Sequence, residues 1–418
     1  MKNNFNNNVF KLVLSTGLSQ IIFVLSSPIL SRVYSPEAFG VFASFFAIIS
    51  ILSTLTSGRY ELAVILPDKN HQSNNIVSTA IFLSFFSLIM ILIFLFLFKD
   101  ILSDLMGSNL FKLIYFIPIG VISLNIFNIF TYHNIKLKKY DDLSFSKIIK
   151  SVSLVFVQLS ISIIDKSALG LLIGFIMSHI FGSIKLFFNT LNNNFLKDIS
   201  FKKMRELSSR YSNFPKYDAP ASLLDIASIQ LPFLLMIKIG GEVVSGNFFL
   251  ASRIIALPSS LIGQSMGQVY FQELNETKYK PGHSFKLLKN TIKKLLIIAL
   301  PSSLLIYTLS PYLFPIIFGD MWILGGQIAQ YLAILSLIQL ITVPLSSTLS
   351  LNRFIKRGAI WKSFNFLLLV SIYIYGIIYD LEFFQFLLYL TTVQFSLYVF
   401  YFIIIVKSVF DIEKDVLR

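Results

Sequence analysis

Apolar runs long enough to cross a bilayer recur along the whole chain, and they restrict its fold more than any other feature. A helix needs about 20 apolar residues to cross a hydrocarbon core of about 30 Å, and inside lipid only helices and closed barrels satisfy their own backbone groups. A hydrophobic share of 55% and a mean hydropathy of +0.74 exclude an ordinary soluble domain. The sequence therefore predicts an all-α polytopic membrane protein with about twelve spans: 9–31, 38–66, 75–98, 110–134, 145–164, 167–190, 213–237, 245–272, 288–309, 323–351, 355–379 and 382–406.

The lysines and arginines support this topology. With the N-terminus inside, 27 of the 35 lie at the inner ends of spans and five lie at the outer ends. This asymmetry follows the positive-inside rule and predicts that both termini are cytoplasmic. The net charge of +14 then reflects topology and anionic headgroups, so we expect membrane lipids as partners and no nucleic acid.

A basic inner loop at about 191–212 divides the chain into two halves of six spans each, 1–198 and 199–418. An internal repeat supports this division, because Gly40 in PEAFGVFA and Gly246 in GEVVSGNFFLA both precede an aromatic residue near the start of a span. The alternative is chance similarity between apolar segments. An even number of spans per half makes the repeats parallel, so we expect two pseudo-symmetric six-helix lobes around a central cavity.

Sequence motifs for covalent chemistry are missing. The chain has no cysteine and no GxxxxGK[ST] loop, and its four histidines lack the spacing of metal ligands. His179, deep in the sixth predicted span, is expected to be a hydrogen-bonded histidine inside the bundle. We expect no catalytic residue, metal or cofactor. A membrane-embedded glycosyltransferase or polymerase is a less favoured alternative, because it would need a sizeable outer loop and the predicted outer loops are very short.

Five charged residues fall inside the predicted spans: Arg59, Glu61, Asp218, Asp225 and Arg253. A charge in hydrocarbon costs a few kcal/mol, so each is a candidate functional residue. On a continuous helix Arg59 and Glu61 would lie about 200° apart and could not pair, so each would need a partner elsewhere. Asp218 and Asp225 would share one helix face. Snorkelling of Arg59 and solvation of Asp218 are the structural alternatives.

Placed on two lobes, these five residues could line one aqueous cavity. Its arginines would suit a phosphate or pyrophosphate group on a substrate. Its carboxylates could bind an H⁺ or Na⁺ whose gradient drives transport of that substrate. Such a cavity would suit a transporter of an anionic substrate. The competing hypothesis is a drug/ion antiporter, whose cavity would be apolar or acidic and would lack arginines.

Three stretches around these charges resemble the Wzx-type oligosaccharide flippases, the polysaccharide branch of the superfamily that also holds MATE efflux pumps and lipid II flippases. The first is SRVYSPEAFGVFASFFAIISIL followed by GRYELAVILP, the second is RYSNFPKYDAPASLLDIASIQLP, and the third is SGNFFLASRIIALPSSLIGQSMGQVYFQEL. The matching residues are Arg32, Tyr34, Ser35, Pro36, Glu37, Phe39, Gly40, Tyr60, Glu61, Ala63, Leu66 and Pro67, then Tyr211, Phe214, Pro215, Tyr217, Pro220, Leu224 and Pro232, then Gly246, Ala251, Arg253, Leu257, Pro258, Gly263, Val269 and Tyr270.

The resemblance implies a MATE-like, V-shaped arrangement of two six-helix lobes that alternates its access. It also implies export of an undecaprenyl-pyrophosphate-linked oligosaccharide across the bacterial inner membrane, for O-antigen, capsule or a related polymer. A polysaccharide polymerase and a chain-length regulator would then be protein partners. The alternative within the same fold is a MATE-like, ion-coupled antiporter of small molecules.

Overall fold

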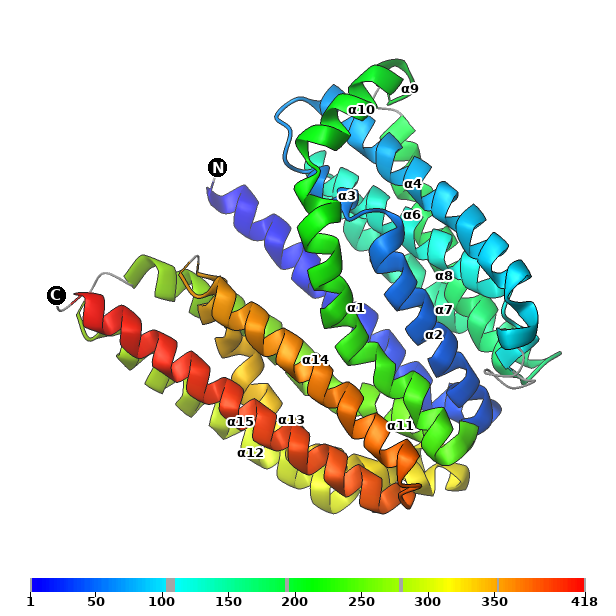
Figure 1. Ribbon diagram of the computed structural model, residues 1–418, viewed down its shortest axis with the longest axis vertical. Coiled ribbons are helices and arrows are strands. Elements are labelled where there is room, and N and C mark those ends of the chain that lie inside the picture. Colours follow the sequence, from blue (N-terminus) through cyan, green and yellow to red (C-terminus); the bar gives the residue numbers. More distant parts are fainter. Residues whose placement is uncertain (1, 103–109, 192–194, 278–280, 352, 417–418) are drawn as a thin grey trace. The chain divides into compact units, whose positions relative to one another are not determined.

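The computed structural model describes residues 2–102, 110–191, 195–277, 281–351 and 353–416 (Figure 1). The regular structure of these residues is helical throughout, without a strand, as expected for the predicted fold class. Eleven helical segments in them are long and apolar enough to cross a membrane. The prediction of an all-α polytopic membrane protein is confirmed.

The chain forms two compact units, Met1–Leu234 and Leu235–Arg418. The predicted division into two lobes at residue 198 stays a prediction.

The first unit contains most of the short helical elements. Its helices are α1 (Lys2–Val33), α2 (Pro36–Thr56), α3 (Tyr60–Ala63), α4 (Asn70–Leu97), α6 (Phe116–Lys136), α7 (Tyr140–Ser162), α8 (Ala168–Leu191), α9 (Phe195–Asp198), α10 (Phe201–Arg210), the π-helical turn η1 (Phe214–Asp218) and the first part of α11 (Ala219–Thr277). The α7 helix packs against both α1 and α8, and α10 packs on α4. Residues 195–218 therefore belong to the first unit through direct contacts.

A close contact with the Tyr34 side chain explains why residue 170 is a glycine. The Tyr34 hydroxyl donates a buried hydrogen bond of 2.6 Å to the backbone oxygen of Gln158 on α7. A Cβ at Gly170, in the first turn of α8, would lie 2.3 Å from that hydroxyl. Only glycine leaves room for the Tyr34 ring at this position.

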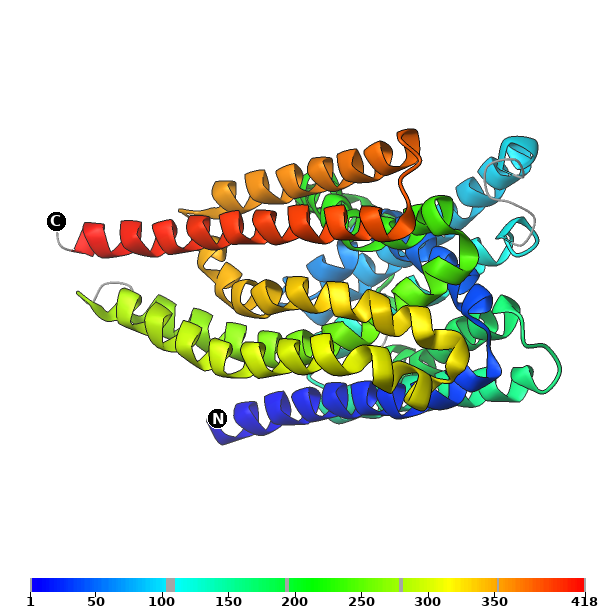
Figure 2. The ribbon, with the colours of Figure 1, turned by 90° about the horizontal axis from the view of Figure 1, so that it is seen from below.

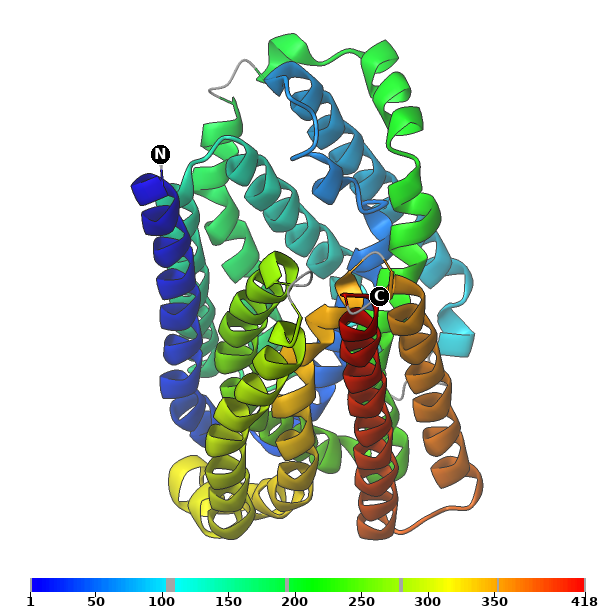
Figure 3. The same ribbon diagram turned by 90° about the vertical axis from the view of Figure 1, so that its left-hand side faces the viewer.

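The second unit holds the rest of α11 with α12 (His283–Phe318), η2 (Asp320–Trp322), α13 (Ile323–Leu345), η3 (Ser346–Ser350), α14 (Ile355–Ile378) and α15 (Phe383–Val416). Helices α12, α13 and α15 lie side by side, and α14 lies against α15 (Figures 2 and 3). In its core the Trp361 ring stacks on Tyr401 with centroids 3.7 Å apart.

The long helix α11 accounts for two predicted spans. The membrane-length segment Phe214–Ser259 has 46 residues, which as one helix would extend about 69 Å, more than twice the hydrocarbon thickness. Gly241 interrupts it with φ 76° and ψ −174°, a conformation that is essentially restricted to glycine. The interruption falls between the predicted spans 213–237 and 245–272, and each remaining membrane-length helix corresponds to one predicted span.

Candidate functional site

The second span ends ten residues earlier than its predicted end at residue 66. Helix α2 stops at Thr56, and Gly58 and Arg59 follow with left-handed φ values of 59° and 58°. Two consecutive residues in this conformation cannot continue a right-handed helix. The one-turn helix α3 starts at Tyr60. Arg59 and Glu61 therefore lie in the connection between α2 and α4 rather than inside a span, which corrects the sequence prediction.

Arg59 is one of three non-glycine residues with positive φ in the described parts of the chain. This conformation costs an L-residue roughly 1–2 kcal/mol. Such strain persists where surrounding contacts hold the residue, and it is enriched at binding sites and switches.

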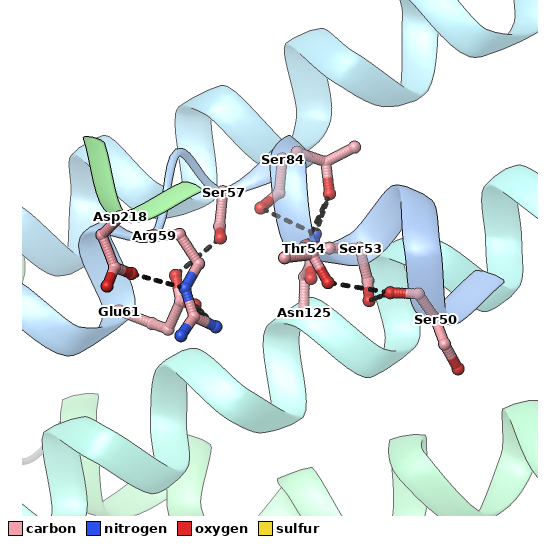
Figure 4. A network of polar contacts seen from close by, with 10 residues as sticks. Ser50, Ser53, Thr54, Ser57, Arg59, Glu61, Ser84, Asn125 and Asp218 are labelled. Atoms are coloured by element: carbon pink, nitrogen blue, oxygen red, sulfur yellow. Dashed lines mark hydrogen bonds and ion pairs between the residues drawn. The ribbon is translucent and has the colours of Figure 1, made fainter. Parts of the chain in front are cut away.

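The contacts that hold Arg59 are two carboxylates (Figure 4). Its Nε–H donates to Asp218 Oδ2 at 3.0 Å, and its Nη1 lies 3.4 Å from Glu61 Oε1. The prediction that Arg59 and Glu61 cannot pair was wrong, because it assumed a continuous helix through both residues. Arg59 also does not snorkel, since its guanidinium lies between two carboxylates. We call Arg59, Glu61 and Asp218 the charge triad.

Glu61 is the buried member of the charge triad, with 5% of its surface exposed. The Ser57 hydroxyl donates to Glu61 Oε2 at 2.6 Å. Burial raises the pKa of the Glu61 carboxyl above its ordinary value, while the hydrogen bond from Ser57 and the charge of Arg59 act in the opposite direction. The charge of Glu61 is therefore maintained by its partners Ser57 and Arg59.

The charge triad joins two parts of the first unit that are far apart in sequence. Asp218 is the last residue of η1, the π-helical turn that leads into α11, and it follows Arg59 by 159 residues. Single π-helical turns are rare and often lie at functional sites. The triad contains one cation and two carboxylates, so Arg59 is fully compensated within it.

Hydrogen bonds from neighbouring helices fix the end of α2 beside the charge triad. The Asn125 amide on α6 donates to Thr56 Oγ1. It also donates, at 3.5 Å, to Ser84 Oγ on α4 (Figure 4). Ser87 donates to the backbone oxygen of Thr56 at 3.2 Å. Because the last carbonyls of a helix have no partner within it, the bond from Ser87 stabilises the termination of α2, and the Asn125 amide holds the Thr56 side chain against α6.

The other two predicted site residues are on α11, one in each unit. Asp225 is partly buried in the first unit, seven residues beyond Asp218. Arg253 is partly buried in the second unit, where its guanidinium lies 5.1 Å from the centre of the Phe249 ring. The structure thus brings Arg59, Glu61 and Asp218 together, and a cavity shared with Asp225 and Arg253 stays a prediction.

Two lysines on α7 were missed as candidate site residues. Lys150 is the eleventh of the 23 residues of α7, about 15 Å from its start, and lies inside the predicted span 145–164. Its ammonium lies 4.6 Å from the centre of the Phe127 ring on α6. One turn earlier, Lys147 Nζ donates to Thr16 Oγ1 on α1 at 2.9 Å. We call Lys147 and Lys150 the α7 lysines.

The α7 lysines have no ion pair with a carboxylate of the described residues, unlike Arg59. The nearby His179 donates a hydrogen bond of 2.8 Å from its Nδ1–H to the backbone oxygen of Phe175, as expected for a bundle histidine, and its ring meets Phe127 edge-on at 5.7 Å. Lys147 and Lys150 thus place two cations on the side of α7 that contacts α1, α6 and α8. Their position inside the predicted span 145–164 could have indicated this role. The positive-inside rule instead assigns both lysines to the inner end of that span.

Metal ligands do not gather in the parts of the chain that the structure describes, because no three His, Cys, Asp or Glu side chains there could hold an ion together. The predicted lack of a metal or cofactor remains a prediction. The site as described is a set of charges suited to binding and ion pairing.

Several solved structures share this fold over nearly the whole chain. An inward-facing multidrug resistance MATE family transporter of the MOP superfamily matches with a TM-score of 0.71 at 14% identity, covering 94% of this chain and 96% of that one. The lipid II flippase MurJ, in an inward closed conformation, matches with a TM-score of 0.74 at 13% identity, covering 97% and 90%. A MOP superfamily transporter from Pyrococcus furiosus with a binding pocket of reverse polarity matches with a TM-score of 0.64 at 14% identity, covering 97% of this chain and 95% of that one. These likenesses show the fold.

No curated protein sequence matches the chain. A family described as "Polysaccharide biosynthesis protein" matches residues 29–324, which is well over half of the chain. The match covers the charge triad, the α7 lysines, Asp225 and Arg253, and it confirms the resemblance found in the sequence. The chain belongs to this family of polysaccharide biosynthesis proteins, and its fold is that of the MOP superfamily transporters.

Proposed function

We propose that the protein is a flippase that moves an undecaprenyl-pyrophosphate-linked oligosaccharide across the bacterial inner membrane, for O-antigen, capsule or a related surface polymer. Membership in a polysaccharide biosynthesis family supports the pathway class. The fold shared with the lipid II flippase MurJ supports a lipid-linked substrate. In this proposal both termini are cytoplasmic, and a polymerase and a chain-length regulator act on the exported unit.

The observation that carries the proposal is the pair of α7 lysines. A lysine inside a spanning helix costs up to about 3 kcal/mol on insertion scales, and a desolvated cation–π contact such as that with Phe127 offsets about 2 kcal/mol. Lys147 adds a second positive charge one turn away. A phosphate oxygen 4 Å from one ammonium would contribute about 4 kcal/mol at an effective dielectric constant of 20. This environment favours an anionic ligand such as a pyrophosphate.

The competing function is a MATE-like antiporter of small molecules, which the shared fold permits. An antiporter for cationic drugs would place carboxylates where this chain has Lys147 and Lys150. The α7 lysines therefore favour the flippase.

In this proposal ion coupling acts at the charge triad. We propose that binding of H⁺ or Na⁺ to Glu61 or Asp218 weakens the hold of these carboxylates on Arg59 and so frees the connection between α2 and α4 from η1. Access would alternate by rocking of two lobes, with Arg253 and Asp225 facing the substrate path. No covalent step is required, so the protein is proposed to act without catalysis.

The experiment replaces the α7 lysines in the native host. Lys147→Gln/Lys150→Gln should reduce surface polymer by at least about tenfold, since losing one favourable contact of 1.4 kcal/mol already changes an equilibrium tenfold. Lipid-linked saccharide should accumulate on the inner leaflet at an unchanged protein level. The matched control is Lys202→Gln/Lys203→Gln, which removes two exposed charges from α10. Normal polymer in the α7 variant, or increased drug sensitivity without a polymer defect, would refute the proposal.

A further inference from the structure

A cavity of about 280 Å³ in the second unit lies between the end of α11 and the start of α12. From α12 it is lined by His283, Lys286, Asn290 and Lys294, which follow one another at the spacing of a single helix face. From α11 it is lined by Tyr270 and Glu273. Its size is near the lower end of small-molecule pockets.

The depth of this cavity matches the headgroup region of a membrane. Helix α12 has no charged residue from Leu295 to Phe318, a length of about 36 Å that fills the hydrocarbon core. Residues 283–294 therefore extend about 18 Å beyond the apolar part, and Lys294 is the last charge before it. Clusters of lysines directly next to a spanning helix attract anionic lipid headgroups.

A second concave surface on α12 continues from the lysines toward the apolar part of the helix. Its volume is about 640 Å³, and it shares Asn290 with the first cavity. Lys289 and Lys293 line one end, and Leu296, Ile297 and Leu300 line the other. Ile297 and Leu300 are more than half exposed, as expected for side chains that face acyl chains.

We propose that these two adjoining surfaces bind one anionic phospholipid of the surrounding bilayer, separately from the transported substrate. The lipid phosphate lies in the first cavity against Lys286 and Lys294, with Asn290 as a neutral hydrogen-bond donor. The acyl chain follows Leu296 to Pro301. Glu273 reduces the positive charge of the cavity, so the site discriminates for one phosphate rather than for any polyanion.

The test measures lipid binding to the purified full-length protein in detergent by native mass spectrometry. The probes are phosphatidylglycerol, phosphatidylcholine and soluble glycerol phosphate. Phosphatidylglycerol should bind at least about fivefold more tightly than either of the others, since a lysine near an anionic lipid surface contributes about fivefold in affinity. Lys286→Gln/Lys294→Gln should lower its affinity about 25-fold, at about fivefold per lysine.

The matched control is Lys356→Gln/Lys407→Gln, which removes two exposed charges from α14 and α15 of the same unit, and it should stay within twofold of wild type. The charge-preserving variant Lys286→Arg/Lys294→Arg should retain binding, which separates lost contacts from misfolding. If the Gln variant and its control lose equal affinity for phosphatidylglycerol, the affinity depends only on overall positive charge, and the proposed site is refuted. Equal binding of phosphatidylcholine, or of glycerol phosphate, would also overturn it.

Discussion

Replacing Arg59 with Gln tests the energetics of the charge triad. The variant leaves the Glu61 side chain, 7% exposed, without a cation, while Asp218, 41% exposed, stays in contact with water. Removing one partner of a fully buried pair costs about 3–5 kcal/mol, whereas an exposed pair contributes about 0–1 kcal/mol. Because the Arg59 side chain is 25% exposed, we expect a loss between these limits, about 2 kcal/mol.

Three companion variants separate the causes of this loss. Asp218→Asn should cost at most about 1 kcal/mol, because its carboxylate is solvated. Adding Glu61→Gln to Arg59→Gln should recover about 1 kcal/mol, because the unpaired buried carboxylate disappears while the amide oxygen still accepts from Ser57. Arg59→Gly should be about 1 kcal/mol more stable than Arg59→Gln, because glycine adopts φ 58° without strain.

The loss of Arg59 should also change the pH dependence. Its positive charge opposes the effect of burial, which raises the pKa of Glu61. A carboxyl with a raised pKa in the folded protein destabilises it only when ionised, so the cost is absent below the ordinary carboxyl pKa and grows as the pH rises through the raised value. Arg59→Gln should therefore lose more stability relative to wild type at pH 8 than at pH 5.

The assay is the thermal unfolding midpoint of the purified protein in detergent. For a unit the size of Met1–Leu234, 2 kcal/mol corresponds to a shift of about 4–8 °C. The reasoning is refuted if Asp218→Asn is at least as destabilising as Arg59→Gln, or if Arg59→Gln/Glu61→Gln is no more stable than Arg59→Gln.

Three further predictions concern packing, backbone and topology. Gly170→Ala should destabilise the first unit by about 1–3 kcal/mol, because the added Cβ meets the Tyr34 hydroxyl. The unfolding midpoint should recover in part in Gly170→Ala/Tyr34→Phe, and a midpoint that does not recover would contradict this cause. Gly241→Ala should cost about 1–3 kcal/mol through its φ of 76° alone, since nothing lies within 4 Å of the added Cβ; a neutral unfolding midpoint would show that the interruption of α11 is not maintained. A cysteine at Ser167 should react with a membrane-impermeant thiol reagent from outside and one at Lys202 only after lysis, and the reverse pattern would overturn the predicted orientation.

The helices could be predicted from apolar length, and the exceptions have identifiable causes. Residues 57–66 are apolar enough to extend the second span, and Gly58 alone does not force a break. Arg59, whose positive φ falls at this break, pairs with Asp218, which follows 159 residues later, and no local pattern encodes that contact. The pairing of Glu61 with Arg59 was not predicted, because the angle of about 200° between the two residues assumes one continuous helix.

Candidate charges were easier to find than their partners. Arg59, Glu61 and Asp218 were recognised because charges are costly in apolar segments, and the structure places them in one cluster. Lys147 and Lys150 fall inside a predicted span by number, yet the positive-inside rule gave them a sufficient explanation at the inner end. Only the packing of α1, α6 and α8 around α7 shows that they face the interior of the unit.

Transport in a reconstituted system tests the central claim most directly. The purified protein is reconstituted in proteoliposomes that carry a radiolabelled polyprenyl-pyrophosphate-linked oligosaccharide in the inner leaflet. An added glycosidase that cannot cross the membrane then measures the appearance of the saccharide in the outer leaflet. Wild type and Lys202→Gln/Lys203→Gln should expose the saccharide well above the rate in protein-free vesicles, and Lys147→Gln/Lys150→Gln should not. Exposure by wild type at the protein-free rate, or undiminished exposure by the α7 variant, would contradict the account.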